Sequence, residues 1–175
     1  MYSNEKSDLF AKDSISILKD IFENDEYKFC SQNIKNHSVL LSHYGIKLNP
    51  KSYDIILAEH LLNPDRHSYQ LDFMSIDYCS SSLQFTNDFF KSNKDISSML
   101  DLDTEGQTYY CCERSDVILQ IYKLQEEKLI AEKLYDYYQK IEQPLVSILS
   151  QMEQNGVYVN NETLAQLSVL LGDKI

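Results

Sequence analysis

The acidic residues that precede and flank Arg114 are the first candidates for chemistry in this chain. Asp103 and Glu105 stand two positions apart in the loop sequence DLDTEG. Glu113 and Asp116 lie on either side of Arg114. Carboxylate oxygens are the ligands that Mg²⁺ and other hard cations need. The DLDTEG stretch is typical of a solvated turn, and on a helix Glu113 and Asp116 point about 100° and 200° away from Arg114. We therefore expect turn, capping and surface roles here rather than a metal site.

Histidine and cysteine, the other common metal ligands, show no metal-binding spacing. Three of the histidines are scattered singly along the chain, namely His43, His60 and His67. The four cysteines contain no C-x-x-C pair and are Cys30, Cys79, Cys111 and Cys112. Zinc ligands or a redox pair would need closer spacing. We expect small buried thiols in a reducing cytoplasm.

Composition and charge narrow the class of protein. The 175 residues are 43% hydrophobic and 25% charged, which is ordinary for a globular domain. The net charge of −11 argues against tight, independent binding of nucleic acid, because Lys and Arg supply most non-specific affinity for phosphates. The opening MYSNEKSDLF lacks the apolar core of a signal peptide, and no run is long enough to span a membrane. We expect a cytoplasmic protein.

Apolar periodicity predicts a mostly helical chain with one or two strands. A short buried strand is expected at Tyr27–Gln32, and Ser52–Leu62 should begin extended and become a helix. The stretch 80–108 is the least defined, with weak amphipathic patterns near Phe85–Phe90 and Ile96–Leu100. A helix break is expected near Gln139. The predicted helices are Ser14–Asn24, Asn36–Tyr44, Gln70–Tyr78, Gln107–Lys140, Gln143–Asn155 and Glu162–Leu171.

Three segments, in collinear order, resemble bacterial DNA polymerase I. Ile141–Val159, IEQPLVSILSQMEQNGVYV, resembles the segment I-E-x-P-L-x-x-V-L-x-x-M-E-x-x-G-V that opens the polymerase domain of that family. Gln32–Leu41, QNIKNHSVLL, is similar to its second exonuclease motif, Q-N-L-K-Y-D-x-x-V-L. Tyr110–Gln120, YCCERSDVILQ, is similar to its third, Y-A-A-E-D-A-D-V-T-L-Q. The resemblance implies the later part of a proofreading exonuclease domain, running into a polymerase domain.

The resemblance also implies a fold and a division into domains. The family's exonuclease domain is an α/β, RNase H-like fold, with helices on both faces of a mixed sheet. Here the fold would be predominantly helical and truncated, because the first strands, with the D-x-E motif, should lie upstream of Ser14 and are missing. Residues 1–140 would form the partial 3′–5′ exonuclease-like domain. Residues 141–175 would be thumb-proximal helices at the start of the polymerase domain.

At the four family-equivalent site positions, the catalytic carboxylates are replaced. The family hydrolyses phosphodiesters with two Mg²⁺ or Mn²⁺ ions held by Asp and Glu. Asn33 and Tyr110 match the motifs, but His37 and Arg114 replace their aspartates. Neutral imidazole is a poor Mg²⁺ ligand. Arg114 keeps a fixed charge, and two unit charges ~4 Å apart repel by about 4 kcal/mol at an effective dielectric of ~20. We expect no retained catalytic residue, no bound metal and no cofactor.

These expectations leave three hypotheses. The first is an inert exonuclease-like domain that supports a following polymerase domain. The second is an active 3′–5′ exonuclease that uses substitute metal ligands or a missing N-terminal segment. The third is a helical interaction protein with a fortuitous resemblance, in which Tyr135, Tyr137 and Tyr138 are core and interface residues rather than base-stacking platforms. The chain holds no palm or fingers motif, so we do not expect it to polymerise DNA by itself.

The expected partners follow from the same reasoning. DNA would be met through the rest of the polymerase, with weak or no independent binding and no membrane contact. The missing strands would leave the strand at Tyr27–Gln32 with an unpaired edge, and such edges template pairing with other chains. We expect a marginally stable, helical chain that self-associates or needs an N-terminal partner segment. Whether Met1 is a natural start, an internal position of a longer gene or an arbitrary boundary stays open at this point.

Overall fold

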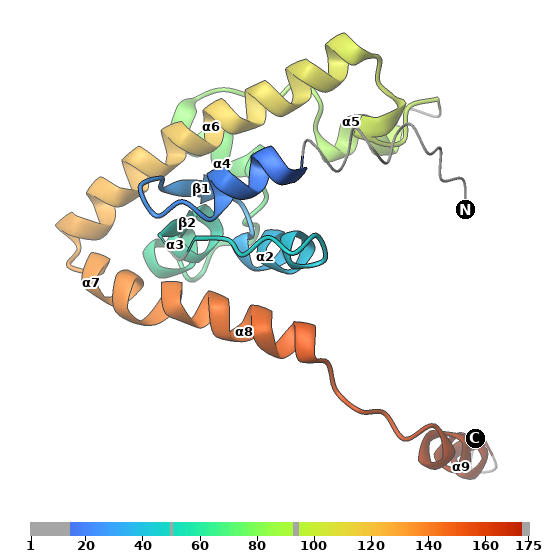
Figure 1. Cartoon of the computed structure of the whole chain (residues 1–175). Helices are drawn as coiled ribbons and strands as arrows, with labels where there is room; N and C mark the ends of the chain where they lie inside the picture. Colours follow the sequence, from blue (N-terminus) through green and yellow to red (C-terminus); the bar gives the residue numbers. More distant parts are fainter. Residues whose placement is uncertain (1–14, 50, 93–94, 173–175) are drawn as a thin grey trace.

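A small parallel sheet lies between a long helix on one side and a helical arm on the other (Figure 1). The computed structural model describes residues 15–49, 51–92 and 95–172. Within them, β1 (Phe29–Ser31) pairs in parallel with β2 (Ser52–Asp54), in the register Cys30 opposite Tyr53. Helix α6 (Thr104–Ala131) crosses one side of this sheet. The predicted strand at Tyr27–Gln32 and the predicted strand-to-helix change within Ser52–Leu62 are both confirmed.

Helix α2 (Ile34–Ser42) connects the two strands, and α3 (Ile55–Leu62) follows β2 directly. Helix α2 begins two residues before its predicted start, after Asn33 adopts a left-handed backbone with φ 64°. It ends at Ser42, two residues before the predicted end at Tyr44, and the chain then turns through Gly45 with φ 70°. Parallel strands need such a crossover connection. The two strand ends and the first turns of two helices therefore meet at one place.

Helix α4 (Leu71–Cys79) lies within one residue of its predicted bounds and packs against α6. Residues 15–22 are helical, and the predicted Ser14 start falls outside the described residues. The weakly patterned stretch contains a short helix α5 (Asn87–Ser92) and one 3₁₀ turn (Met99–Asp101). None of the helices within the described ranges is long and apolar enough to cross a bilayer.

The core lies where β2, α3 and α4 meet α6. Helix α6 contributes a stripe of buried residues at every fourth position, Val117, Ile121, Gln125 and Leu129. The buried residues that surround this stripe include Tyr53, Ile55, Ala58, Leu71, Met74, Leu83 and Tyr138. The spacing of four residues keeps the stripe on one side of the helix. The other side of α6 faces water, and it carries Cys111 and Cys112, which are exposed. Our expectation that all four thiols are small and buried is therefore wrong for these two.

The predicted helix from Gln107 to Lys140 is wrong in its bounds and in the place of its break. Helix α6 starts earlier, at Thr104, and ends at Ala131. The chain then reverses at Lys133, whose φ is 62°. A single turn α7 (Tyr135–Tyr137) and a π-helical segment (Tyr138–Glu142) follow. The reversal buries Tyr138 completely. This burial stabilises the left-handed backbone of Lys133, a position at which the sequence has neither glycine nor proline to indicate a turn.

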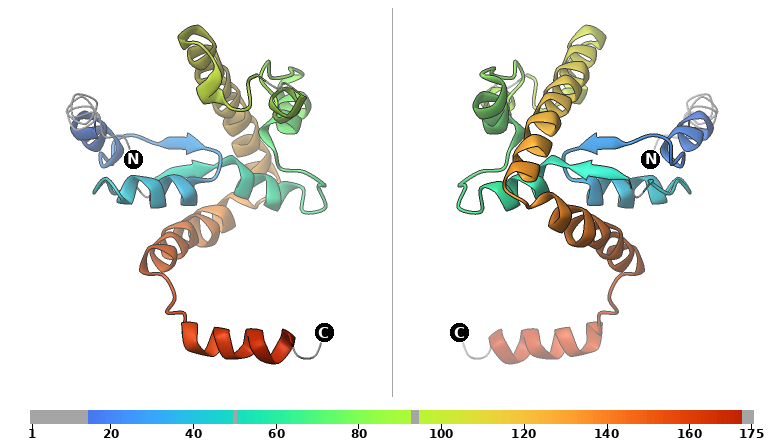
Figure 2. Two further views of the ribbon diagram at one scale, coloured as in Figure 1. Left: turned by 90° about the vertical axis from the view of Figure 1, so that its right-hand side faces the viewer. Right: turned by 90° about the vertical axis from the view of Figure 1, so that its left-hand side faces the viewer.

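The last two helices agree closely with their predictions. Helix α8 (Gln143–Asn155) ends at Gly156, which has φ 68°. Helix α9 (Asn161–Gly172) is capped by Asn160, whose side-chain oxygen accepts the Thr163 amide at 3.1 Å. Helix α8 packs on α2. Helix α9 lies apart from the body at the end of an extended segment (Figures 1 and 2).

Candidate functional site

The second-motif positions lie at the junction of β1 and α2. His37 is exposed, and its Nδ1 lies 3.0 Å from the Ser31 hydroxyl. Asn33 is exposed as well, and its side chain makes no capping hydrogen bond. Beside them lies an apolar groove of about 350 Å³, lined in part by Phe22, Phe29 and Leu40. His37 therefore meets one hydroxyl and an apolar wall, which is not a ligand set for a hard cation.

The N-terminus of α2 is capped by the side chain of Asp54 and not by that of Asn33, the residue directly before the helix. One carboxylate oxygen accepts the Ile34 amide of α2 at 2.7 Å, and the other accepts the Ile56 amide of α3 at 2.9 Å. The residue is buried, and its own backbone amide donates to the Tyr138 hydroxyl oxygen at 2.8 Å. A carboxylate at a helix N-terminus is stabilised by the exposed amides. This carboxylate is thus used structurally, and neither its sequence position nor its neighbours suggested that role.

The third-motif positions, Tyr110 and Arg114, lie one turn apart on α6 and are in direct contact. The guanidinium carbon of Arg114 lies 3.7 Å from the centre of the Tyr110 ring. Its Nη2 donates to the backbone oxygen of Phe85 at 2.6 Å. The rings of Phe85 and Phe90 lie 6.5 and 6.0 Å from that of Tyr110. Tyr110 is thus part of an aromatic cluster whose open face is covered by a cation.

Two carboxylates balance the charge of Arg114. Asp72 on α4 lies 3.7 Å from Nη2, and Glu113 lies 3.9 Å from Nη1. Glu113 also accepts the Gln84 amide, at 3.1 Å from one oxygen, so it anchors the loop before α5 rather than facing solvent as we expected. Arg114 itself is only 17% exposed. The guanidinium thus links α4, α6 and the loop that contains Phe85.

A divalent metal does not fit this arrangement. Within the described ranges, no group of three or more His, Cys, Asp or Glu residues is placed to hold an ion. No hydrogen bond or ion pair between described residues joins His37 to Arg114, which belong to different parts of the body. A fixed positive charge beside the remaining carboxylates opposes a dication. The motif positions Asn33, His37, Tyr110 and Arg114 themselves offer no carboxylate ligand to such an ion.

The other acidic candidates have capping and surface roles. Asp103 is exposed and caps α6 by accepting the Gly106 amide at 2.8 Å. Glu105 is exposed in the first turn of that helix. Asp116 is exposed and accepts from Gln120, one turn later, at 2.7 Å. Of the cysteines, Cys30 is half-buried, and burial raises the pKa of its thiol to about 12, so it stays protonated.

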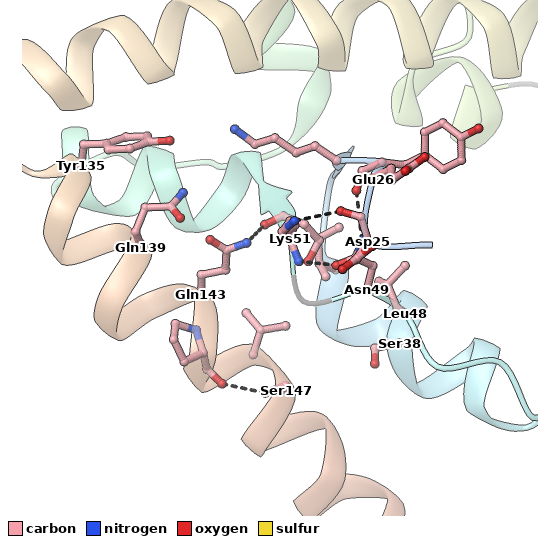
Figure 3. A pocket seen from close by; sticks show the side chains of 16 residues that line it. Asp25, Glu26, Ser38, Leu48, Asn49, Lys51, Tyr135, Gln139, Gln143 and Ser147 are labelled. Atoms are coloured by element: carbon pink, nitrogen blue, oxygen red, sulfur yellow. Dashed lines mark hydrogen bonds between the residues drawn. The ribbon is translucent and has the colours of Figure 1, made fainter. Parts of the chain in front are cut away.

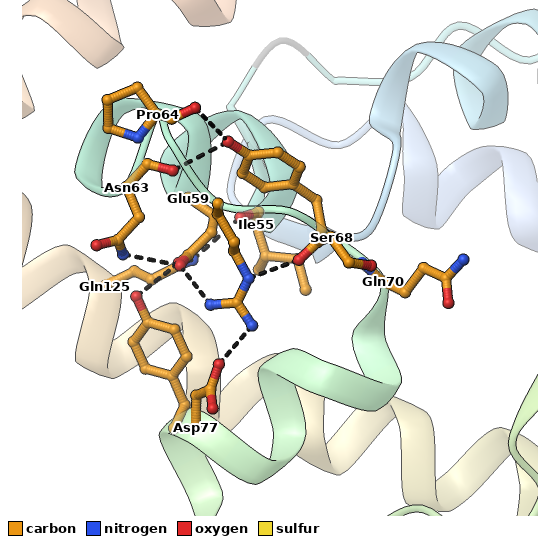
Figure 4. A network of polar contacts seen from close by, with 11 residues as sticks. Ile55, Glu59, Asn63, Pro64, Ser68, Gln70, Asp77 and Gln125 are labelled. Carbon is orange, nitrogen blue, oxygen red and sulfur yellow. Dashed lines mark hydrogen bonds and ion pairs between the residues drawn. The ribbon is translucent and has the colours of Figure 1, made fainter.

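The most heavily bonded carboxylate is one that sequence reasoning missed, Glu59 on α3 (Figure 4). It is fully buried and accepts hydrogen bonds from four side chains, at 2.6 to 2.9 Å, contributed by Tyr78, Gln125, Asn63 and Arg66. Arg66 reaches on to Asp77 at 2.5 Å. Burial alone would raise the pKa of Glu59, but its donors together hold that pKa below its usual range. The sequence does contain a signal for this buried carboxylate, because Glu59 stands inside the apolar run IILAEHLL.

Such a buried carboxylate could suggest acid–base catalysis, but its surroundings do not. Every donor to Glu59 comes from the protein and links α3, α4, α6 and the intervening loop. An ionised carboxylate with a lowered pKa is a weak base, whereas a general base works best with a pKa near the working pH. The network is therefore a structural tie between helices.

A cleft of about 600 Å³ lies between α8 and the segments that precede the two strands (Figure 3). Gln139 and Gln143 approach from one side, and Asn49 and Lys51 from the other. Several of its polar groups bond to the protein itself. Gln143 donates to the backbone oxygen of Ser52, and Lys51 donates to that of Asp25 at 2.9 Å. The hydroxyl of Ser147 donates to the backbone oxygen of Pro144 at 2.9 Å and not to a basic side chain that could activate it.

Comparison with known proteins adds an independent line of information. No protein-family model matches the chain. It is 27% identical to DNA polymerase I of Rhizobium leguminosarum over 158 residues, which are 90% of this chain and 15% of that protein. It is 30% identical to DNA polymerase I of Synechocystis over 177 residues, 93% of this chain and 17% of that protein. It is 25% identical to the Borreliella burgdorferi enzyme over 150 residues.

These matches cover most of this chain but only a small part of each relative. The chain spans less than a fifth of the length of the curated relatives it matches. The mostly helical architecture with a small sheet is compatible with an α/β portion of such a protein. The chain is thus related by sequence to bacterial DNA polymerase I and matches a short segment of it.

Proposed function

We propose that this chain is the exonuclease-like segment of a DNA polymerase I-like protein of replication or repair, and that its role there is architectural. Residues 1–140 form a partial 3′–5′ exonuclease-like domain of RNase H-like ancestry. Residues 141–175 begin the polymerase domain. The collinear motifs and the sequence relationship support this division, and α8 continues without a loop from the π-helical segment that crosses residues 140 and 141.

Arg114 is the observation that carries the proposed loss of catalysis. A residue that had only lost its function as a metal ligand would need no particular contacts. Arg114, in contrast, contacts four neighbouring residues. It stacks on Tyr110, donates to Phe85 and lies within 4 Å of Asp72 and Glu113. The tyrosine that would orient water is thereby held in an aromatic cluster. Hydrolysis would require the metal ligands to be rebuilt against this structural bonding.

Contact with DNA, in this proposal, belongs to the rest of the polymerase. The chain's net charge of −11 repels phosphates on average. The lysines at the cleft do not form a continuous basic track, since Lys51 bonds to a backbone oxygen and Lys28 to Glu126 at 2.9 Å. Weak or no independent binding of DNA follows, and the cytoplasm is the compartment that this role requires.

A nuclease assay tests the proposal directly. Pure chain is incubated with an end-labelled, single-stranded oligonucleotide in Mg²⁺ and, separately, in Mn²⁺. We expect no shortening in either metal. The double variant His37→Asp, Arg114→Asp is also expected to show no robust activity, because two-metal hydrolysis takes ligands from three segments and only two are restored.

Two results would contradict the proposal. Processive, Mg²⁺-dependent shortening by the unmodified chain would establish the second hypothesis, an active exonuclease with substitute ligands. Cleavage by the double variant at a rate close to that of an intact family member would show that two segments are enough. A heat-denatured sample and an EDTA sample, both run in parallel, exclude a contaminating nuclease.

A further inference from the structure

Helix α8 is connected to α6 through a short segment, residues 134–143, which we call the joint. The chain reverses at Lys133 and then passes through α7 and the π-helical segment Tyr138–Glu142 directly into α8. In Figure 1 the joint lies where α6 and α8 converge. It contains no glycine and no proline. Linkers between mobile units are normally exposed and rich in such residues, so this is not the composition of a flexible linker.

Tyr138 attaches the joint to the sheet. Its side chain is fully buried, and the centre of its ring lies 4.8 Å from that of Tyr53 on β2. The hydroxyl oxygen accepts the backbone amide of Asp54 at 2.8 Å, and the hydroxyl donates to the backbone oxygen of the same residue at 3.3 Å. At the other end of the joint, Gln143 donates to the backbone oxygen of Ser52. Packing and hydrogen bonds therefore hold the joint against β2.

Asp54 extends this attachment to α2. Its carboxylate accepts the amide of Ile34, the first residue of α2, at 2.7 Å. The next residue, Lys35, pairs with Glu153 of α8, and the two helices pack against each other. Contacts thus run from the joint through β2 and α2 to α8, and along α8 back to the joint. A closed ring of this kind restrains the direction of α8 at two separate places.

The hydroxyl of Tyr138 contributes something that burial of its ring does not. Burial of apolar surface is non-directional, whereas a hydrogen bond weakens steeply as its angle departs from linear. The two bonds to Asp54 therefore select one rotational position of the π-helical segment against β2. Helix α8 follows this segment without a loop, so the same bonds determine the direction in which α8 leaves the body. Turns of π-helix are rare and are frequently found at functional sites.

We propose that this ring of contacts is a rigid joint, and that Tyr138 is the positioning residue that couples the start of α2 to the direction of α8. Under the proposed function, on which this inference rests, residues from 141 onward begin the polymerase domain. The joint then sets the angle at which the following domain leaves the exonuclease-like body. The second-motif positions Asn33 and His37 lie at the start of α2, within the element that the joint holds. The architectural role is thereby given to particular contacts.

Hydrogen exchange followed by mass spectrometry tests the coupling segment by segment. Tyr138→Phe keeps the ring and removes both hydrogen bonds to Asp54. We expect the amides of α8 and of the first turn of α2 to exchange roughly tenfold faster, and those in the buried part of α6 to change much less. Tyr137→Phe removes the hydroxyl of the adjacent, exposed tyrosine and is the matched control, with no change expected in any segment.

A second variant tests whether the contacts form a ring. Lys35→Met removes the ion pair with Glu153, which is partly exposed, so by itself it should raise exchange in α8 only about twofold. Lys47→Met removes the charge of an exposed lysine and controls for net charge. In a ring, either attachment still holds α8 when the other is lost. The double variant Tyr138→Phe, Lys35→Met should therefore exceed the product of the two single effects by roughly threefold or more.

Four results would overturn the inference. Exchange in α8 of the unmodified chain as fast as in the exposed helix α9 would show that α8 is not held. An unchanged α8 in Tyr138→Phe, or equal acceleration of every segment, would remove the coupling role of Tyr138. A double variant equal to the product of its singles would show that the two attachments act separately. The measurement needs neither DNA nor metal, so a positive nuclease assay would contradict the loss of catalysis and leave the joint unaffected.

Discussion

The surroundings of Arg114 and the last two helices, α8 and α9, differ in which kinds of side chain they bury. Around Arg114, charged groups that would normally face water are half-buried and bonded to one another across α4, α6 and a loop. On α8 and α9, by contrast, aliphatic side chains are exposed to water, although such side chains are normally buried. Both regions lie in segments that resemble motifs of the same enzyme family. The first region pairs most of its charged groups with one another, and the second exposes apolar side chains to water.

This difference indicates where the chain can tolerate change. Where charges are satisfied internally, removal of one partner leaves the others buried and uncompensated, and the cost is large. Where apolar groups are already exposed, alteration of one costs the isolated chain little, since no packing is lost. The stability of the body should therefore depend on single charges, whereas substitutions on the exposed sides of α8 and α9 should change it little.

The largest effect is expected from Glu59→Ala. Its removal leaves four donors without their acceptor inside the body, and we expect the free energy of unfolding to fall by about 3–5 kcal/mol. The urea midpoint measures this loss. Glu127→Ala, an exposed glutamate of α6, is the matched control and should change the midpoint very little. A loss below about 1 kcal/mol for Glu59→Ala would show that the buried network is dispensable.

A smaller loss, of about 2–4 kcal/mol, is expected from Arg114→Asp alone. The substitution removes the bond to Phe85 and the stacking on Tyr110, and it places a third carboxylate beside Asp72 and Glu113. Arg114→Met keeps the aliphatic stem and should cost less. Thermal melting with and without 10 mM Mg²⁺ checks both the loss and the metal. Stabilisation of the aspartate variant by Mg²⁺ would mean that a cation site had been recreated.

Acid should destabilise the body through the same network. The folded pKa of Glu59 lies below its unfolded value, so its contribution is complete above the unfolded pKa and is lost as pH falls through the folded one. Glu126, held by Lys28 and two tyrosines, has a lowered pKa and the same sign. Unfolding in urea, followed from about pH 6 to about pH 3, should show a shallower decline for Glu59→Gln than for the unmodified chain. Parallel curves would assign the acid sensitivity to other carboxylates.

The smallest effect is expected from removal of residues 157–175. At sub-micromolar concentration, where association is absent, the free energy of unfolding of the body should change by less than about 0.5 kcal/mol, because α9 touches so little of it. A large loss at low concentration would mean that α9 folds back on the body and would weaken the contrast between the two regions.

Local sequence patterns were sufficient to predict the bounds of several helices and strands. The apolar spacing and Gly156 predicted α8 with its observed bounds, and α9 was predicted to within one residue at each end. The strand-to-helix change at Asp54 was visible in the sequence as well. Such features depend on residues a few positions apart, which is the range over which propensity and capping act. The break at Lys133 was misplaced, since it is stabilised by burial of Tyr138, and burial is not a local property.

For the candidate site, the sequence determined which residue types occupy the motif positions, and hence that the family's aspartates are absent at His37 and Arg114. Tertiary structure decided what the remaining groups do. Asp54 caps two helices at once, Glu59 collects donors from three other segments, and the apolar stripe of α8 faces outward. Helical spacing determines that four side chains share one side of a helix, but the direction of that side depends on how distant segments pack. That packing is a balance of burial and pairing over the whole chain, which no short window of sequence contains.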